Sequence, residues 1–170
     1  MHLLVIRHAV AEDKTRFALT GQSDDLRPLT TEGRSKMRRA VRGLRELVAT
    51  PTRVATSPLV RANETAQLVA TAFGVTRIET VEALRPESPY EELVAWLGPR
   101  SDSGDGPIVV VGHEPHLGGL VTWLMTGTDT SRVELKKGGA CLLVFDEAPS
   151  AGGARLRWLV TPGQLRQLAR

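Results

Sequence analysis

Two histidines and two arginines stand out because each follows a short apolar run closely. Arg7 and His8 end the run that opens the chain, Arg61 follows a second run, and His113 follows a third. A neutral imidazole nitrogen can attack phosphorus and carry a phosphoryl group, and guanidinium groups bind phosphate oxygens through paired N–H donors. These residue types therefore predict an anion site capable of phosphoryl transfer.

The elements that must position these residues alternate along the chain. Short apolar or β-branched runs predict strands near 2–7, 53–57, 77–81, 108–112, 140–146 and 155–160. Helical periodicity lies between them, over 37–48, 58–73, 90–98 and 116–126. Strands separated by helices favour parallel pairing and a sheet covered on both faces. We expect an α/β fold, a three-layer α/β/α sandwich whose central sheet is mostly parallel, with the final hairpin supplying any antiparallel strand.

In open α/β sheets, ligands bind beyond the carboxyl ends of the strands, where the four residues should meet. Ser57 is a good N-cap and Pro58 suits the first helical position. Arg61 would then lie in the first turn of a helix, beside free N–H groups and the positive end of the helix dipole. This segment is therefore expected to contribute to the anion site.

The bulk composition predicts an ordinary globular protein. A length of 170 residues favours one domain, 1–170, and the polar stretch 101–107 is too short to link domains. The single cysteine, Cys141, excludes an internal disulfide. Neither a signal peptide nor an apolar stretch of membrane-spanning length is evident, so we expect a cytoplasmic protein. The net charge of +3 permits either a nucleic acid or an anionic substrate as the partner.

Four motifs, in order along the chain, resemble those of the histidine phosphatase superfamily. Arg7-His8-Ala9 resembles its RHG motif, with alanine where glycine is usual. The later matches are Leu29-Thr30-x-x-Gly33, Ser57-Pro58-Leu59-x-Arg61-Ala62-x-x-Thr65-Ala66 and Val111-Gly112-His113-Glu114-Pro115. The matched residues are most similar to the short SixA-type phosphohistidine phosphatases of that superfamily.

The resemblance implies a phosphoglycerate mutase-like fold and a two-step phosphoryl transfer. His8 would be the nucleophile, and Arg7, Arg61 and His113 would bind the phosphate. No metal or organic cofactor is implied. The expected partner is a protein that carries phosphohistidine, with a small phosphate ester as the alternative substrate.

The acid that protonates the leaving group is not assigned by any motif, and Glu82 and Glu87 are both candidates. An imidazole leaving group has a pKa near ~6.5 and departs with little help, whereas an alkoxide needs an acid worth roughly 10²–10⁴-fold. The range 62–112 holds only 51 residues, which leaves little room for a lid over a small metabolite. Both points favour phosphohistidine on a protein over a small-molecule phosphomonoesterase.

Alternatives from other classes of function remain at this point. His116 could pair with His113 on a metal, but further ligands at suitable spacing are not evident. Cys141 lies in an apolar run and lacks the arginine six residues later that a cysteine phosphatase has. The basic residues of the first helix could guide an acidic partner or a nucleic acid, although aromatic residues make up only 4% of the chain. A non-catalytic phosphate- or nucleic-acid-binding module is the remaining alternative.

Overall fold

A six-stranded sheet of order β3-β2-β4-β1-β5-β6 forms the middle layer of the computed structural model, which describes residues 1–100 and 106–169. Its strands are β1 (His2–Arg7), β2 (Arg53–Thr56), β3 (Ile78–Thr80), β4 (Ile108–Gly112), β5 (Ala140–Phe145) and β6 (Ala154–Val160). The first four strands pair in parallel, whereas β5 runs antiparallel to both β1 and β6. The predicted strands and their pairing are confirmed.

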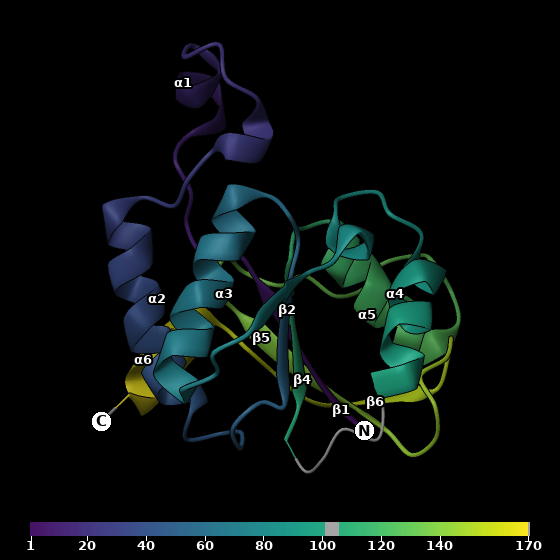
Figure 1. The fold of residues 1–170 in the computed structure, drawn as a ribbon. Helices are drawn as coiled ribbons and strands as arrows, with labels where there is room; N and C mark the ends of the chain where they lie inside the picture. The colour runs from purple at the N-terminus through teal and green to yellow at the C-terminus, as the bar shows by residue number, and fades with distance from the viewer. Residues whose placement is uncertain (101–105, 170) are drawn as a thin grey trace.

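Helices cover both faces of this sheet (Figure 1). One face carries α2 (Thr31–Leu44), α3 (Val60–Phe73) and α6 (Pro162–Leu168), and the other carries α4 (Tyr90–Leu97) and α5 (His116–Thr126). The short helices η2 (Glu82–Leu84) and η3 (Gly98–Arg100) flank α4 in sequence. The expected three-layer α/β/α sandwich is thereby confirmed, while most of the 101–107 connection lies outside the described residues.

The pleat of the central strands explains how one sheet supports two cores. Leu3 and Val5 of β1 face the cluster packed against α4 and α5, whereas Leu4 and Ile6 face the cluster packed against α2 and α3. All four side chains are fully buried. Successive side chains of a strand point to opposite faces, so a strand covered on both sides must be apolar throughout. The polar residues of β1 are thus confined to its ends, and Arg7 and His8 lie at the carboxyl end.

The start of α2 shows why its sequence motif has a glycine. Thr30 caps the helix, and its Oγ1 accepts a hydrogen bond from the Gly33 amide at 2.8 Å. A Cβ atom on Gly33 would lie only 2.1 Å from the carbonyl oxygen of Val10. Only glycine therefore allows the chain after β1 to pack against the first turn of α2.

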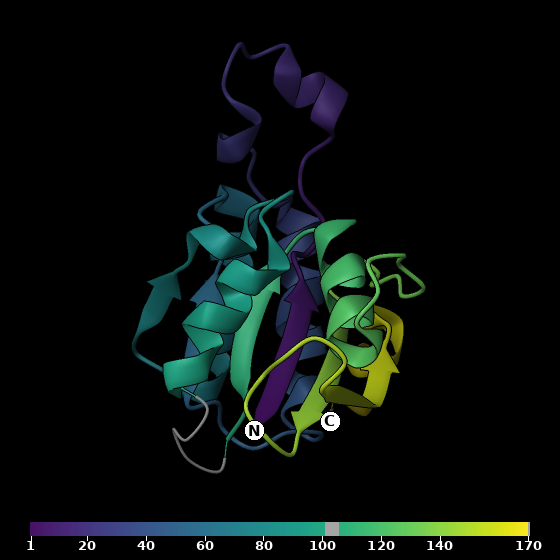
Figure 2. The ribbon, with the colours of Figure 1, turned by 90° about the vertical axis from the view of Figure 1, so that its right-hand side faces the viewer.

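That chain forms an arm between β1 and α2, residues 10–28, which projects beyond the carboxyl ends of the parallel strands (Figures 1 and 2). It contains α1 (Lys14–Ala18) and η1 (Asp24–Leu26). The Glu12 amide donates to the Pro28 carbonyl at 2.9 Å, which closes the base of the arm. The sequence analysis did not predict α1 or α6, because helices of five and seven residues are too short to show a periodic pattern.

Candidate active site

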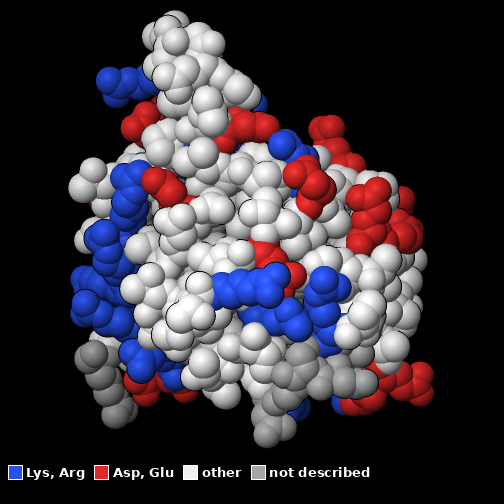
Figure 3. Space-filling model, viewed as in Figure 1, with Lys and Arg blue, Asp and Glu red and all other residues white. Residues whose placement is uncertain are grey.

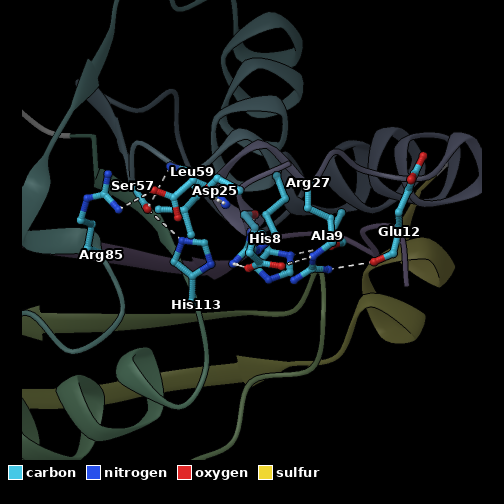
Figure 4. Close-up of polar contacts among 12 residues, drawn as sticks. His8, Ala9, Glu12, Asp25, Arg27, Ser57, Leu59, Arg85 and His113 are labelled. Carbon is cyan, nitrogen blue, oxygen red and sulfur yellow. Dashed lines mark hydrogen bonds and ion pairs between the residues drawn. The ribbon is translucent and has the colours of Figure 1, made fainter. Parts of the chain in front are cut away.

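A cavity of about 620 Å³ opens at the carboxyl ends of β1, β2 and β4, beneath the arm. Its lining consists of Arg7, His8, Ala11, Glu12, Asp13, Lys14, Asp24, Arg27, Arg61, Pro86, His113, Glu114 and Lys137. The structure brings all four residues of the predicted phosphate site to this one cavity. Figure 4 shows His8 and His113 beside each other, with the arm residues Glu12, Asp25 and Arg27 around them.

His8 is held in one orientation by backbone contacts. Its amide donates to the Gly112 carbonyl at 3.0 Å, and its ring Nδ1 donates to the Ala9 carbonyl at 2.7 Å. Because the carbonyl can only accept, the proton of the neutral ring lies on Nδ1 and the lone pair on Nε2. Burial, with smaller contributions from the charges of Arg61 and Arg7, lowers the pKa of His8 to about 4. His8 is therefore neutral near pH 7, with the lone pair of its ring on Nε2.

The matched motif in α3 fixes the backbone beside this histidine. The Ala9 amide donates to Thr65 Oγ1 at 3.0 Å, and the Thr65 hydroxyl donates to the Arg61 carbonyl at 2.7 Å. Ala9 is buried and occupies the position at which the RHG motif has glycine. The methyl group is accommodated, and the Ala9 carbonyl still orients the ring of His8.

The two arginines reach the cavity from different elements and are anchored by their outer nitrogens. Arg7 Nη1 donates to the Leu135 carbonyl at 2.7 Å, and Arg61 Nη1 donates to the Asp24 carbonyl at 2.9 Å. An ion pair of 3.2 Å joins Arg61 Nη2 to the Asp24 carboxylate. Burial and the nearby charge of Arg27 lower the pKa of Arg61. The Nε atoms of Arg7 and Arg61 are buried and have no protein partner, so each retains an unsatisfied donor.

His113 is the fourth predicted phosphate-site residue in this cavity, and its ring contacts Ser57. Its Nε2 lies 2.8 Å from Ser57 Oγ, and its ring centre lies 5.1 Å from that of His8. Burial, and then the nearby His8 and Arg61, lower the pKa of His113 to about 2, so the ring is neutral. If the Ser57 hydroxyl donates to Nε2, the proton lies on Nδ1, a buried atom without a protein partner.

The predicted role of Ser57 as a helix N-cap is wrong. The N-cap of α3 is Leu59, which makes no side-chain cap hydrogen bond. The Leu59 amide approaches Ser57 Oγ at 3.4 Å, and the same hydroxyl contacts His113. Ser57 is thus a positioning residue for His113, and Arg61 is still in the first turn of α3.

Sequence reasoning missed two acidic residues of this cavity. Asp24 holds Arg61, and the hydrogen bond from Arg27 lowers the pKa of its carboxyl group, so Asp24 is ionised. Glu114 Oε1 accepts the Leu135 amide at 2.9 Å, and burial raises the pKa of the Glu114 carboxyl group. Glu114 stood inside a matched motif and could have been found there, whereas Asp24 lies in a polar stretch that gives no such signal.

The candidate acids Glu82 and Glu87 do not line the cavity. The Glu82 carboxylate is 74% exposed and pairs with Arg85 at 2.8 Å, and Arg85 also pairs with Asp25. Glu87 lines a neighbouring cavity, with its backbone in the left-handed region at φ 71°. Neither residue is part of the lining around His8, so the role of leaving-group acid stays a prediction for both.

The described residues offer no alternative chemistry at Cys141 or at a metal centre. No group of three or more His, Cys, Asp or Glu side chains among them could hold a metal ion. Cys141 is buried in β5, and burial raises the pKa of its thiol to about 12. A thiol with this pKa is protonated near pH 7 and is a poor nucleophile.

Among the residues that the structure describes, no helix is both long and apolar enough to cross a membrane.

The layered fold and the histidine–arginine cavity are those that the motifs predicted for a phosphoryl-transfer domain, and comparison with known families gives the family. The model of the histidine phosphatase superfamily (branch 1) matches residues 3–88. An uncharacterized protein of Picosynechococcus sp. strain PCC 7002 is 32% identical over 139 residues, or 82% of each chain. The chain belongs to the histidine phosphatase superfamily, whose members include phosphatases.

Other relatives place the chain near one branch of the superfamily. Phosphohistidine phosphatase SixA of Escherichia coli K12 is 26% identical over 98% of this chain and 97% of its own. The structure of the protein histidine phosphatase SixA complexed with tungstate has a TM-score of 0.82 and 26% identity, covering 97% and 99% of the two chains. A mycobacterial glucosyl-3-phosphoglycerate phosphatase with inorganic phosphate has a TM-score of 0.72 at 17% identity, over 95% and 98%, and shares the fold. The resemblance to the SixA-type branch noted from the motifs is thereby confirmed.

Proposed function

We propose that this single-domain protein is a phosphatase that works through a phosphorylated His8 and removes phosphate from phosphohistidine on another protein. The observation that carries the proposal is the tautomer of His8, whose Nδ1 is tied to the Ala9 carbonyl at 2.7 Å. The nucleophilic Nε2 is left for the cavity, between two anchored arginines. A structure of the SixA relative is complexed with tungstate, an oxyanion, which supports the presence of an oxyanion site in a protein of this branch.

The unsatisfied donors of the cavity fit a phosphoryl group. Arg7 Nε and Arg61 Nε are buried donors without a protein partner, and His113 Nδ1 is a third when the Ser57 hydroxyl donates to His113 Nε2. A buried donor without an acceptor costs about 1–3 kcal/mol, so a bound anion that supplies oxygen acceptors would relieve this cost. Guanidinium donors also offset the charge that spreads over the phosphoryl oxygens during transfer.

In the first step, His8 Nε2 attacks the phosphorus atom. A bond between Nε2 and phosphorus forms while the bond between phosphorus and the substrate's imidazole nitrogen breaks. The substrate ring, protonated on its other nitrogen, retains the electron pair of the broken bond and departs as neutral imidazole. Arg7, Arg61 and His113 hold the oxygens of the transferred group throughout.

In the second step, water attacks the phosphorus atom of phosphorylated His8. The new oxygen–phosphorus bond replaces the nitrogen–phosphorus bond, the protons of water stay with the phosphate or pass to solvent, and Nε2 regains its lone pair. The enzyme returns to its neutral starting tautomer. No cofactor is needed for either step.

The carboxyl groups of the cavity favour an imidazole leaving group over an alkoxide. Asp24 is ionised beside Arg27, Asp13 caps α1 by accepting the Arg16 amide at 2.9 Å, and the Glu12 carboxylate points away from His8 (Figure 4). The candidate acids Glu82 and Glu87 are not part of the lining. Burial raises the pKa of the half-buried Glu114, but its carboxyl group is already engaged as an acceptor by the amides of Leu135 and Gly118. A leaving group with a pKa near ~6.5 does not require the acid that an alkoxide needs.

The test compares two peptides of one sequence that carry either phosphohistidine or phosphoserine. We expect kcat/KM for the phosphohistidine peptide to be higher by roughly 10²-fold or more. Acid quenching during turnover should destroy an enzyme-bound phosphate that alkaline quenching preserves, as a phosphoramidate requires. Efficient phosphoserine hydrolysis would instead favour a phosphate ester as the substrate, and the absence of any phosphoenzyme would exclude His8 as the nucleophile.

A further inference from the structure

A second cavity of about 570 Å³ adjoins the candidate active site. Pro86 lines both cavities, and the second one begins at Pro115 and His116, directly after the segment that carries His113. Its walls come from the connection 86–89, from the start of α4 and α5, and from the segment after α5. The second cavity is therefore within reach of a protein substrate held at His8, and the proposed chemistry does not use it.

The second cavity is acidic, whereas the lining of the active site carries charges of both signs, with five basic and four acidic residues. Three carboxylates line it, those of Glu87, Glu91 and Asp129, and the described residues of its lining include no lysine or arginine. Figure 3 shows acidic side chains gathered over α4, while basic side chains run along α2 at the opposite edge. Arg85, which precedes the cavity in sequence, is paired with Asp25 and Glu82. The space therefore attracts cations.

His116 adds a buried acceptor to the lining. His116 is only 5% exposed, and its ring Nε2 donates to the Ser88 carbonyl at 2.9 Å. The proton of the neutral ring is thus on Nε2, and Nδ1, buried and without a protein partner, carries a lone pair. A buried acceptor of this kind is satisfied by a ligand that donates hydrogen bonds.

The first turn of α5 does not turn the cavity into an anion site. Its amides already have partners: Leu117 donates to the His113 carbonyl at 2.8 Å, and Gly119 donates to the Pro115 carbonyl at 3.1 Å. The Gly118 amide bonds to the Glu114 side chain. Since these amides are satisfied, the carboxylates and His116 decide which ligand fits.

We propose that this second cavity binds a lysine or arginine side chain that lies near the phosphohistidine of the substrate protein. The inference rests on the proposed function and adds the chemistry that selects the substrate. An ammonium or guanidinium group supplies the N–H donors that the carboxylates and His116 accept. A metal ion fits less well, since no group of three or more potential ligands among the described residues is arranged to hold one.

The experiment uses phosphohistidine peptides in which one lysine is moved along the sequence on either side and replaced by norleucine in each matched control. For the best lysine position, we expect wild-type kcat/KM to exceed that of the norleucine peptide by about tenfold, mainly through KM. Raising the salt from about 0.05 to about 0.5 M should weaken this preference. The ratio between the two peptides is measured within each enzyme, so general changes in the active site cancel.

Two variants locate the preference. The double variant Glu91→Gln, Asp129→Asn removes two carboxylates of the cavity and should bring the ratio close to one. The matched variant Glu147→Gln changes an exposed carboxylate outside the cavity and should keep the wild-type ratio. A wild-type ratio near one at every lysine position, or a preference that survives in the double variant, would overturn the proposal.

Binding separates this proposal from the proposed function. The same peptides with unmodified histidine can be titrated into the wild-type protein by calorimetry, which requires no turnover. If no phosphohistidine peptide is hydrolysed but the lysine peptide still binds more tightly than its control, the catalytic proposal fails and the cation subsite stands. If hydrolysis is efficient and neither binding nor turnover depends on lysine, the subsite fails alone.

Discussion

The two adjoining cavities each contain a buried, neutral histidine, but the two rings differ in which nitrogen carries the proton and in the charges around them. His8 in the active site donates from Nδ1 to a carbonyl and keeps its lone pair on Nε2, whereas His116 in the second cavity donates from Nε2 and keeps its lone pair on Nδ1. Arginines surround the first ring, and carboxylates lie near the second. Burial lowers the pKa of both rings.

The comparison shows that the imidazole ring alone does not define the chemistry. A phosphoryl group is attracted to His8 by the charges of Arg7 and Arg61, and it is repelled from His116 by the neighbouring carboxylates. The same carboxylates suit a cationic side chain. A phosphohistidine and a basic residue of one protein could thus be recognised side by side, each by the cavity of opposite charge.

The sharpest way to break this comparison is to remove the histidine of the active site. His8→Ala should lower kcat on the phosphohistidine peptide by on the order of 10³-fold or more, because the covalent step is lost. His2→Ala is the matched control, since His2 is an exposed residue at the other end of β1. Activity within about tenfold of wild type, in a His8→Ala protein with an unchanged circular dichroism spectrum, would remove His8 from its proposed role.

The next largest effect should come from replacing one guanidinium group while keeping its charge. Arg61→Lys leaves a cation beside Asp24 but removes the rigid fork of donors, so we expect kcat/KM to fall by roughly 10²-fold. Tungstate should also bind more weakly, as measured by calorimetry. Arg39→Lys, on the exposed side of α2, provides the control. Tungstate affinity equal to that of wild type would show that Arg61 does not bind the anion.

Much of the fold could be predicted because the central strands are buried on both faces. Apolar runs such as Ile108–Val111 leave little choice of structure, and their parallel order fixes where the following polar residues meet. That is why Arg7, Arg61 and His113 could be placed at one edge without coordinates. Short elements such as α1 gave no periodic pattern, and their local signals are confined to single caps such as Asp13.

The parts of the site that could not be predicted depend on contacts between distant segments. Asp24 reaches Arg61 only because the arm folds over the cavity, and Ser57 was interpreted as a cap because nothing local reveals its contact with His113. The expectation for Glu82 and Glu87 relied on sequence position alone. The structure ties Glu82 to Arg85 and places Glu87 beside the second cavity.

The pH dependence of the reaction can sharpen the contrast between a buried and an ordinary histidine. His8 must be neutral to attack, and its pKa is lowered to about 4, so activity should be lost only as the pH falls toward that value. An ordinary histidine would lose activity near pH ~6.5. The acid limb of kcat/KM, corrected for spontaneous hydrolysis of the substrate, measures the pKa of the free enzyme. A limb near pH ~6.5 that persists in the Glu114→Gln variant would contradict the burial of a neutral His8.

The smallest effects should follow changes to the carboxylates that lie outside the active site. Glu82→Gln removes one partner of Arg85, and an exposed ion pair contributes little to stability. Glu87→Gln removes a carboxylate of the second cavity. On a phosphohistidine peptide without lysine or arginine, both variants should stay within roughly threefold of wild-type kcat/KM, because the imidazole leaves without their help. Glu92→Gln changes an exposed carboxylate on α4 and serves as the control, because its effect on kcat/KM shows what a change outside both cavities does.

An alkyl phosphate assayed with the same variants separates the two leaving groups. If wild type hydrolyses the ester slowly and neither variant matters, the active site lacks an acid from this segment, as the exposed position of Glu82 indicates. If wild type hydrolyses the ester efficiently and one variant loses roughly 10²-fold or more, that glutamate must move to the cavity during catalysis. The protein would then be an ester phosphatase, and the cavity beside Glu87 would belong to the leaving group instead of to a basic side chain.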